Sequence, residues 1–288
     1  MSAVQDVRSE NDPDELRRVA EQLAADAAEF VRRRRTEITG EAAQTPAVLR
    51  SKSSPTDPVT IADTDTERFV RQRLAQCRPG EPILGEELTD GQGTDREGRV
   101  RWVVDPIDGT VNFVYGIPAY AVSVAAQIDG VSVAGAVADV CSGEVYSAAA
   151  GRGASVSGGV AGAAGRVPLR CTSADELSMA LIGTGFGYQT ARRAAQAALL
   201  ADLLPLVRDV RRIGSAALDL CAVAAGRLDA HYEHGLNVWD WAAGALIAAE
   251  AGAVVVLPDG PAGLLVAAAP GVAAELIAAL QRLAPRIP

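Results

Sequence analysis

Two acidic residues, Asp105 and Asp108, stand three positions apart directly after the predominantly apolar run "RVRWVV". Pro106 between them removes a backbone donor and ends the ladder of hydrogen bonds, while Gly109 permits close backbone approach. Thr110 can then begin a helix, whose free N–H groups form an anion site. Two carboxylates held together repel each other unless a cation lies between them. The block D-P-I-D-G-T therefore predicts an oxygen-ligated metal ion beside a bound phosphate, in preference to an ordinary Asx-Pro turn.

Three further acidic motifs could belong to the same site, although each also has a purely structural interpretation. Glu86 and Glu87 follow the short strand "PILG", so they could reach the same sheet edge as Asp105 or form a solvated turn. Asp63, in the stretch D-P-V-T-I-A-D, could act in chemistry or serve only as a turn and cap residue. Asp240, in "NVWDW", could bind a metal or cap the helix that follows it.

Helices and strands must bring these residues together. Apolar residues recur at helical spacing over 14–35, which predicts a helix that ends at the arginine run 32–35, where cations suit the negative end of the dipole. We interpret this run as a solvated helix end in preference to a nucleic-acid contact. Residues 40–44 and the stretch "KSSPTDP" are predicted to be loops, and a second helix is predicted near 61–76.

The middle of the chain changes to the two-residue period of strands. The predicted strands there are "EPILGEE", "RVRWVVD", "YAVSVAAQI", "VSVAGAVADV" and "GEVYSAAA". Residues 151–165 are rich in Gly, Ala and Ser and are predicted to form a hairpin or a surface loop.

The last part of the chain alternates between the two periods. Its predicted elements are the strand "MALIGTGF", a helix over 191–207, the strand "DVRRI", a helix over 215–225, the strand "LDAHYE", a helix over 240–251, the strands "AVVVL" and "LLVAAA", and a helix from about Val272. This order predicts an α+β protein built of stacked layers. We expect a flexible N-terminus over 1–13, an α+β subdomain over 14–165 that carries the metal-binding loops, and a C-terminal α/β subdomain over 166–288.

Composition restricts the class of protein. Hydrophobic residues make up 49% of the 288 residues and aromatic residues only 4%, so Val, Ala, Leu and Ile must build the core. The net charge of −9 argues against nucleic acid as the main partner. Four scattered cysteines, the lack of a signal-like N-terminus and the lack of a long apolar span predict a cytoplasmic protein without a membrane segment.

Competing chemistries lack their motifs. His231 and His234 form H-x-x-H without a third ligand and are predicted to be rim or surface residues, not a zinc site. There is no G-x-x-x-x-G-K-[ST] and no G-x-S-x-G. The glycines at 183, 185 and 187 lack the dinucleotide spacing, and we expect them to let the backbone approach the rim of the site.

The order of these motifs resembles the inositol monophosphatase family, the magnesium-dependent and lithium-sensitive phosphatases that share a fold with fructose-1,6-bisphosphatases. Four motifs occur in the order of the family: D-P-V-T-x-x-D, G-E-E, W-V-x-D-P-I-D-G-T-x-N-F, and a W-D before an Ala/Gly-rich helix ending E-A-G. The resemblance covers about 16–283. It implies a layered α-β-α-β-α sandwich and a homodimer, and the predicted element order agrees with that sandwich.

The resemblance also implies two to three Mg²⁺ ions in each active site. Glu86, Asp105 and the carbonyl of Ile107 would hold the first ion, and Asp105, Asp108 and Asp240 would hold the second. A third, weaker ion would lie near Glu86. The resemblance also makes Glu86 a catalytic residue. Asp108 and Asp240 would contact the substrate in addition to the metal. Carboxylate and carbonyl oxygens are the donors that Mg²⁺ prefers.

The same resemblance assigns the substrate contacts. Gly109 and Thr110 would receive the phosphate with their backbone amides, while Asp63 and Thr110 would orient the water that attacks it. Glu233 matches the family acid that binds sugar hydroxyls. The loop beside it comprises Gly214, Ser215 and Ala216. Lys52, the single lysine, matches a family lysine near the metal loop, where it could balance charge or be merely exposed.

We therefore expect a phosphomonoesterase that hydrolyses myo-inositol 1-phosphate by direct attack of a metal-activated water. Fructose 1,6-bisphosphate, histidinol phosphate and 3′-phosphoadenosine nucleotides are the alternative substrates, and Glu233 with the loop at 214–216 favours inositol among them. A protein that keeps the fold but acts only as a regulatory binder is the alternative from another class.

Overall fold

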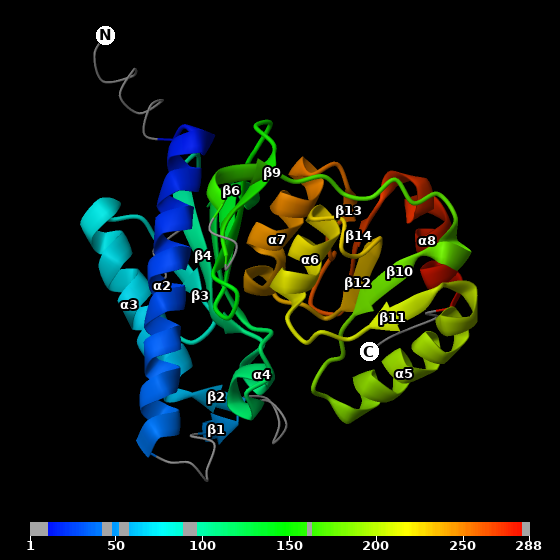
Figure 1. Ribbon diagram of the computed structural model, residues 1–288, viewed down its shortest axis with the longest axis horizontal. Coiled ribbons are helices and arrows are strands. Elements are labelled where there is room, and N and C mark those ends of the chain that lie inside the picture. Colours follow the sequence, from blue (N-terminus) through cyan, green and yellow to red (C-terminus); the bar gives the residue numbers. More distant parts are fainter. Residues whose placement is uncertain (1–10, 42–47, 52–57, 89–96, 160–162, 284–288) are drawn as a thin grey trace.

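The computed structural model describes residues 11–41, 48–51, 58–88, 97–159 and 163–283, and it consists of alternating layers of helices and sheets (Figure 1). Helices α2 (Pro13–Glu41) and α3 (Ile61–Cys77) cover the outer face of the first sheet. Helices α6 (Ala216–Ala224) and α7 (Val238–Glu250) lie between the two sheets. Beyond the second sheet lie α5 (Thr190–Leu203) and α8 (Pro270–Leu283). This arrangement confirms the predicted α+β fold with α-β-α-β-α layers.

The first sheet has seven strands in the order β3-β4-β5-β6-β7-β8-β9. Its strands are β3 (Ile83–Gly85), β4 (Val100–Asp108), β5 (Ala121–Ile128), β6 (Val131–Asp139), β7 (Glu144–Ala149), β8 (Ala154–Gly158) and β9 (Ala163–Pro168). Only β3 and β4 run parallel, and each later neighbour pairs antiparallel. The Gly-rich segment 151–165, predicted as a hairpin or surface loop, contributes β8 and the first residues of β9, which pair antiparallel.

The second sheet has the order β11-β10-β12-β14-β13. Its strands are β10 (Leu181–Thr184), β11 (Asp209–Arg211), β12 (Ala230–His234), β13 (Val254–Val256) and β14 (Leu264–Ala268). Strand β10 runs parallel to both of its neighbours, whereas β14 runs antiparallel to β12 and β13. Short 3₁₀ turns occupy Leu177–Met179 and Leu204–Leu206.

Small side chains allow the layers to approach closely. The inner stripe of α2 is fully or almost fully buried, and it consists of Leu16, Ala20, Leu23, Ala24, Ala27 and Val31. A Cβ at Gly135 in β6 would lie 3.0 Å from the Cα of Ala243 in α7, so the sheet and the middle helices are in backbone-level contact. An Ala-rich core with few aromatic residues packs in this way because its ridges are low.

Several boundaries differ from the sequence predictions. Helix α2 continues to Glu41 instead of ending at the arginine run, so Gly40 belongs to the helix. The run also does more than close a helix: Arg32 donates to the carbonyl of Val140 at 3.1 Å, and Arg35 lies over the ring of Phe113. These contacts to the rest of the protein extend the helix, because propensity alone does not set helix ends.

Other differences lie nearer the acidic motifs. A small sheet of β1 (Val48–Ser51) and β2 (Pro58–Thr60) was not predicted from the sequence. Strand β4 runs on through Asp108, with a register shift after Asp105 where Pro106 interrupts the pairing with β5. Within the described ranges, no helix combines the length and apolar character needed to cross a bilayer.

Candidate active site

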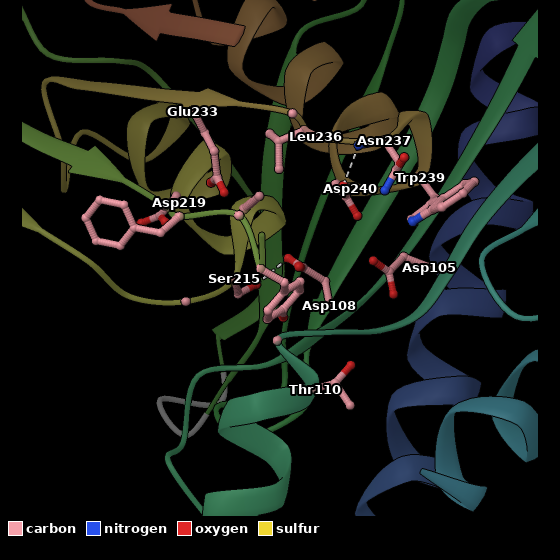
Figure 2. Close-up of a pocket in the computed structure, with 18 of the residues that line it drawn as sticks. Asp105, Asp108, Thr110, Ser215, Asp219, Glu233, Leu236, Asn237, Trp239 and Asp240 are labelled. Carbon is pink, nitrogen blue, oxygen red and sulfur yellow. Dashed lines mark hydrogen bonds between the residues drawn. The ribbon is translucent and has the colours of Figure 1, made fainter. Parts of the chain in front are cut away.

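A pocket of about 490 Å³ opens where the end of β4, the N-termini of α6 and α7, and the end of β12 meet (Figure 2). Its lining includes the residues Glu86, Asp105, Ile107, Asp108, Gly109, Thr110, Gly185, Gly187, Arg192, Arg212, Gly214, Ser215, Ala216, Asp219, Glu233, His234, Trp239 and Asp240. Figure 2 shows the carboxylates of Asp105, Asp108 and Asp240 turned toward the same part of this pocket. Of the predicted site residues, all but Asp63 line it directly.

Asp105 and Asp108 take up different positions at the irregular end of β4. Asp105 is buried and accepts a hydrogen bond of 3.0 Å from the backbone N–H of Ile107, which folds the turn back on the carboxylate. Oδ2 of Asp108 accepts from the hydroxyl of Ser215 at 2.5 Å and from the backbone N–H of Ala217 at 2.7 Å. The second aspartate is therefore anchored to the N-terminus of α6, on the other side of the pocket.

Asp63 lies behind the pocket and acts on it through Thr110. The Thr110 hydroxyl lies 3.2 Å from Oδ1 of Asp63 and 3.1 Å from the carbonyl oxygen of Ile107. Thr60 fixes the other oxygen of Asp63 with its backbone N–H at 2.8 Å and its hydroxyl at 2.5 Å. Asp63 is thus a cap residue of α3, as the structural interpretation predicted, and it is also in contact with Thr110.

Gly109 is the residue that lets this turn close. It has a left-handed backbone with φ of 96°, and a Cβ there would lie 2.9 Å from the carbonyl oxygen of Ala119. An L side chain would be strained in both respects. Helix α4 (Thr110–Tyr115) then begins directly after Gly109, as the sequence predicted.

The glutamate turn is held in place by a residue that sequence reasoning missed. Glu67 of α3 is fully buried, accepts from the backbone N–H of Glu87 at 2.7 Å and pairs with Arg71 at 2.8 Å. A Cβ at Gly85 would lie 2.1 Å from Oε1 of Glu67, so a side chain there would displace this carboxylate. This anchoring sets the position of Glu86 in the pocket wall, and the solvated-turn interpretation is wrong for Glu86.

Asp240 serves two roles that the sequence left as alternatives. Helix α7 begins at Val238 rather than at Asp240, and Oδ2 of Asp240 accepts from the backbone N–H of Asn237 at 2.6 Å in a capping box. The same carboxylate also lines the pocket. Capping and a position in the site are therefore compatible.

The pocket disfavours the negative charge of its acids. Burial raises the pKa of Asp108, although the hydrogen bonds from Ser215 and the α6 amides and the charge of Arg212 oppose that shift. The pKa of Asp240 is raised well above its usual range by burial and by the nearby charges of Glu86 and Asp108. Carboxylates that are crowded and desolvated in this way are stabilised in their charged form by a bound cation.

The donor set suits a hard divalent ion. The groups available are carboxylates and the carbonyl of Ile107, and these are the ligand atoms that Mg²⁺ and Ca²⁺ bind. Among the described residues, no three acidic, imidazole or thiol groups already converge closely enough to be a preformed metal site. The pocket suits a cation because it offers oxygen donors and because its buried carboxylates repel one another when they are ionised.

One histidine prediction is wrong. His231 is 0% exposed and lies between Asp219 and Glu233 instead of at the rim or surface. Strand β12 lies between β10 and β14, with helices on both faces of the sheet, so the position of His231 is covered. His234 lines the pocket, as a rim position would.

The predicted substrate loop also reaches the pocket. Gly214, with φ of 99°, precedes the cap residue Ser215 of α6, and Glu233 lines the same pocket. Gly185 and Gly187 lie on the rim, as predicted. Lys52 and Asp57 lie outside the described residues. The pocket lining also includes three residues that were not predicted from the sequence, Arg192, Arg212 and Asp219. Of these, only Arg212 could have been found, because it lies two residues before the Gly-Ser-Ala loop.

Five alternating layers with a carboxylate-lined pocket at the junction of the sheets are what the resemblance to lithium-sensitive phosphatases implied. The chain belongs to the inositol monophosphatase family, whose model matches residues 12–286. This membership supports a phosphatase activity.

Individual relatives agree with this family. The chain is 65% identical over 284 residues to inositol-1-monophosphatase SuhB of Mycobacterium tuberculosis, with 96% of each chain covered. It is 37% identical over 210 residues to Nus factor SuhB of Escherichia coli, with 73% of this chain and 75% of that protein covered. The solved structure of Mycobacterium tuberculosis SuhB matches with a TM-score of 0.80 at 61% identity, covering 95% of this chain and 98% of that one.

Proposed function

We propose that this chain is a Mg²⁺-dependent phosphomonoesterase that hydrolyses myo-inositol 1-phosphate to inositol and phosphate. The observation that carries the proposal is the convergence of Glu86, Asp105, Asp108, Asp240 and Thr110 on one pocket, in a chain of this family. The names of the mycobacterial relatives, inositol-1-monophosphatase, support the choice of substrate.

The metal ligands follow from the donors in the pocket. Glu86, Asp105 and the carbonyl of Ile107 would hold one Mg²⁺, and Asp105, Asp108 and Asp240 would hold another. When bound, such ions neutralise phosphoryl oxygens and lower the pKa of a coordinated water. The anchoring of Asp108 by Ser215 and of Asp240 by Asn237 fixes one oxygen of each carboxylate and leaves the other free to act as a ligand.

Thr110 and Asp63 supply the proton path. The Thr110 hydroxyl has one proton, and its two acceptors, Asp63 and the carbonyl of Ile107, lie on the protein side. Its lone pairs are therefore directed elsewhere and can accept a proton from a water in the pocket, while Asp63 takes up the hydroxyl proton. The attack is a direct in-line displacement, so no covalent phospho-enzyme forms.

The substrate is oriented by its two ends. The backbone at Gly109 and Thr110, next to the short helix α4, would receive the phosphate. Glu233 in the lining of the same pocket would accept a hydrogen bond from a ring hydroxyl, with the loop at 214–216 beside it. A homodimer in the cytoplasm and sensitivity to Li⁺ belong to the same proposal, on the basis of the family resemblance.

The decisive experiment is a comparison of kcat/KM for four esters in the presence of Mg²⁺, with and without millimolar Li⁺. The esters are myo-inositol 1-phosphate, fructose 1,6-bisphosphate, histidinol phosphate and a 3′-phosphoadenosine nucleotide. We expect the inositol ester to be preferred and its turnover to be inhibited by Li⁺. A higher kcat/KM for another ester would show that this ester, and not the inositol ester, is the preferred substrate. Turnover of none of them would favour a binding role, which the name of the Nus factor relatives supports.

A further inference from the structure

Three polar groups lie in a row at the pocket wall, with Asp219 and Glu233 in the lining and His231 enclosed between them. The imidazole of His231 has its Nδ1 at 3.7 Å from Oδ2 of Asp219 and its Nε2 at 3.6 Å from Oε2 of Glu233. His231 is fully enclosed, and both of its ring nitrogens and Oδ1 of Asp219 lack a hydrogen-bond partner among the described residues. Buried polar groups without partners are costly, so this row calls for an explanation.

The neighbouring strand leaves space for this row. A Cβ at Gly183 of β10 would lie 3.0 Å from Nδ1 of His231 and 3.3 Å from Oδ1 of Asp219. A Cβ at Gly185 would lie only 2.1 Å from Oε2 of Glu233. The two glycines are two positions apart, so they face the same side, and a side chain at either would push into the row. Room for the three groups is therefore built into the backbone of the second sheet.

Counting protons shows how the row can be satisfied. Each of its two contacts joins a ring nitrogen to a carboxyl oxygen. Each contact becomes favourable only when one proton lies between that nitrogen and that oxygen. Two protons fill both contacts and leave the three groups with a net charge of −1. One arrangement has a protonated Asp219 donating to Nδ1 and a neutral His231 donating from Nε2 to an ionised Glu233.

The electrostatic surroundings agree with this arrangement. Burial raises the pKa of Asp219 well above its usual range, with added repulsion from Glu233 and Asp108, and burial lowers the pKa of His231 to about 3. Burial and the charge of Asp108 raise the pKa of Glu233 to about 8, opposed by Arg212. A donor at the inner oxygen of Glu233 would stabilise the ionised form that burial disfavours.

We propose that His231 is a positioning residue that holds the carboxylate of Glu233 ionised and turned toward the pocket, with Asp219 fixing the imidazole from the other side. In this role the 3.6 Å contact shortens by a few tenths of an ångström so that Nε2–H of His231 donates to the inner oxygen of Glu233, while the outer oxygen accepts a hydroxyl of a polyol phosphate. The inference rests on the proposed phosphatase function and identifies what makes its pocket selective for hydroxyl-bearing esters. His231 itself does not touch the substrate.

The test compares H231F, which cannot donate, with H231Q, whose amide can donate to Glu233 and accept from Asp219. Each is assayed with Mg²⁺ on myo-inositol 1-phosphate and on phenyl phosphate, which has no hydroxyl for Glu233. We expect H231F to raise KM for the inositol ester by about 10- to 100-fold, as for the loss of a hydrogen bond to a charged group, with kcat within about threefold. Kinetics on phenyl phosphate should be unchanged, and H231Q should restore most of the lost affinity.

The pH profile adds a readout that a merely structural role would not move. Glu233 without its donor should take up a proton at higher pH, so the pH below which KM for the inositol ester rises should be higher in H231F than in the unmodified chain. Nitrogen-15 NMR of labelled histidine should show His231 as the Nε2–H tautomer, and the signal is assigned by its loss in H231F. These spectra need no substrate.

The outcomes are separable. Equal losses on both esters, an unchanged KM in H231F, or an Nδ1–H tautomer would overturn the role of His231 while leaving the phosphatase in place. If the unmodified chain hydrolyses neither ester, the proposed function itself fails. If H231F does not fold, the tautomer in the unmodified chain and the comparison with H231Q decide the question.

Discussion

The hydroxyl of Thr110 lies 3.2 Å from Oδ1 of Asp63, although the two residues are 47 positions apart in the chain. The contact joins the first turn of α4 to the first turn of α3. Because Asp63 is buried and held by Thr60, it can take up the hydroxyl proton of Thr110 without moving.

The first prediction concerns this pair. Thr110→Ala and Asp63→Asn should each lower kcat on myo-inositol 1-phosphate by about 10²- to 10⁴-fold, because each removes one half of the proton path. The double variant should be little worse than either single variant, since the two act as a unit. Thr110→Ser keeps the hydroxyl and is the control, and independent, multiplying losses would contradict a shared path.

The second prediction concerns Asp105. Asp105→Asn should abolish turnover even at saturating Mg²⁺, because an amide oxygen is a much weaker ligand for a hard cation than a carboxylate. The melting temperature should change little, since the amide oxygen can still accept from the N–H of Ile107. Asp129→Asn, in an exposed turn with φ of 51°, is the matched control and should leave activity unchanged. Substantial residual turnover would remove Asp105 from the metal site.

The third prediction concerns the buried anchor Glu67. Glu67→Gln should lower the free energy of unfolding by about 2–4 kcal/mol, because it breaks a buried pair with Arg71. It should also raise the Mg²⁺ concentration needed for half-maximal activity, since the turn that carries Glu86 loses its anchor. Denaturant unfolding and Mg²⁺ titration measure the two effects.

The control for that variant is an exposed ion pair. Glu29 and Arg33 are both 61% exposed, and Glu29→Gln should cost less than about 1 kcal/mol with no change in the Mg²⁺ requirement. If Glu67→Gln behaved like Glu29→Gln, the carboxylate of Glu67 would not be holding the turn.

The fourth prediction is the pH dependence of one surface cluster. The hydrogen bond from Arg227 lowers the pKa of Glu144, with burial opposing and Tyr146 assisting. A carboxylate whose pKa is depressed on folding stabilises the protein above its unfolded pKa of about 4.3 and loses that contribution as the pH falls through the folded value. Since Arg227 is 57% exposed, the contribution is only about 0.5–1 kcal/mol.

Thermal unfolding of Glu144→Gln checks this sign. The variant should melt about 1–3 °C below the unmodified chain at pH 7, and the two curves should converge as the pH falls through the lowered pKa of Glu144, below which both carry a neutral side chain. A difference that persisted or grew in acid would show that the side chain acts by packing rather than by charge.

How much of this could be predicted from the sequence differs from residue to residue. The D-P-I-D-G-T block was informative because a proline, a glycine and two acids in fixed order define a turn and its chemistry locally. The layered fold was also predictable, since strand and helix periods alternate clearly after residue 165. The assignment of roles to the site residues stays a prediction.

The misses have a common physical cause. Glu67 reads as one more charged residue on a helix, and only its burial against the turn at Gly85 reveals it as an anchor. His231 lies in "LDAHYE", whose alternation does not show that both faces of β12 are covered. Helix α2 runs past its arginine run because Arg32 and Arg35 contact distant parts of the chain. Each miss depends on contacts between segments remote in sequence.

One oxygen atom, Oδ2 of Asp108, accepts two hydrogen bonds from the start of α6 while its own backbone belongs to the seven-stranded sheet. The wall of the pocket is thus also a seam between two layers of the molecule. A motion that separates the sheet from α6 would break these two hydrogen bonds and change the pocket wall, so a ligand bound to Asp108 should oppose such a motion. Occupancy of the site and the contact between the sheet and α6 are therefore linked at this side chain.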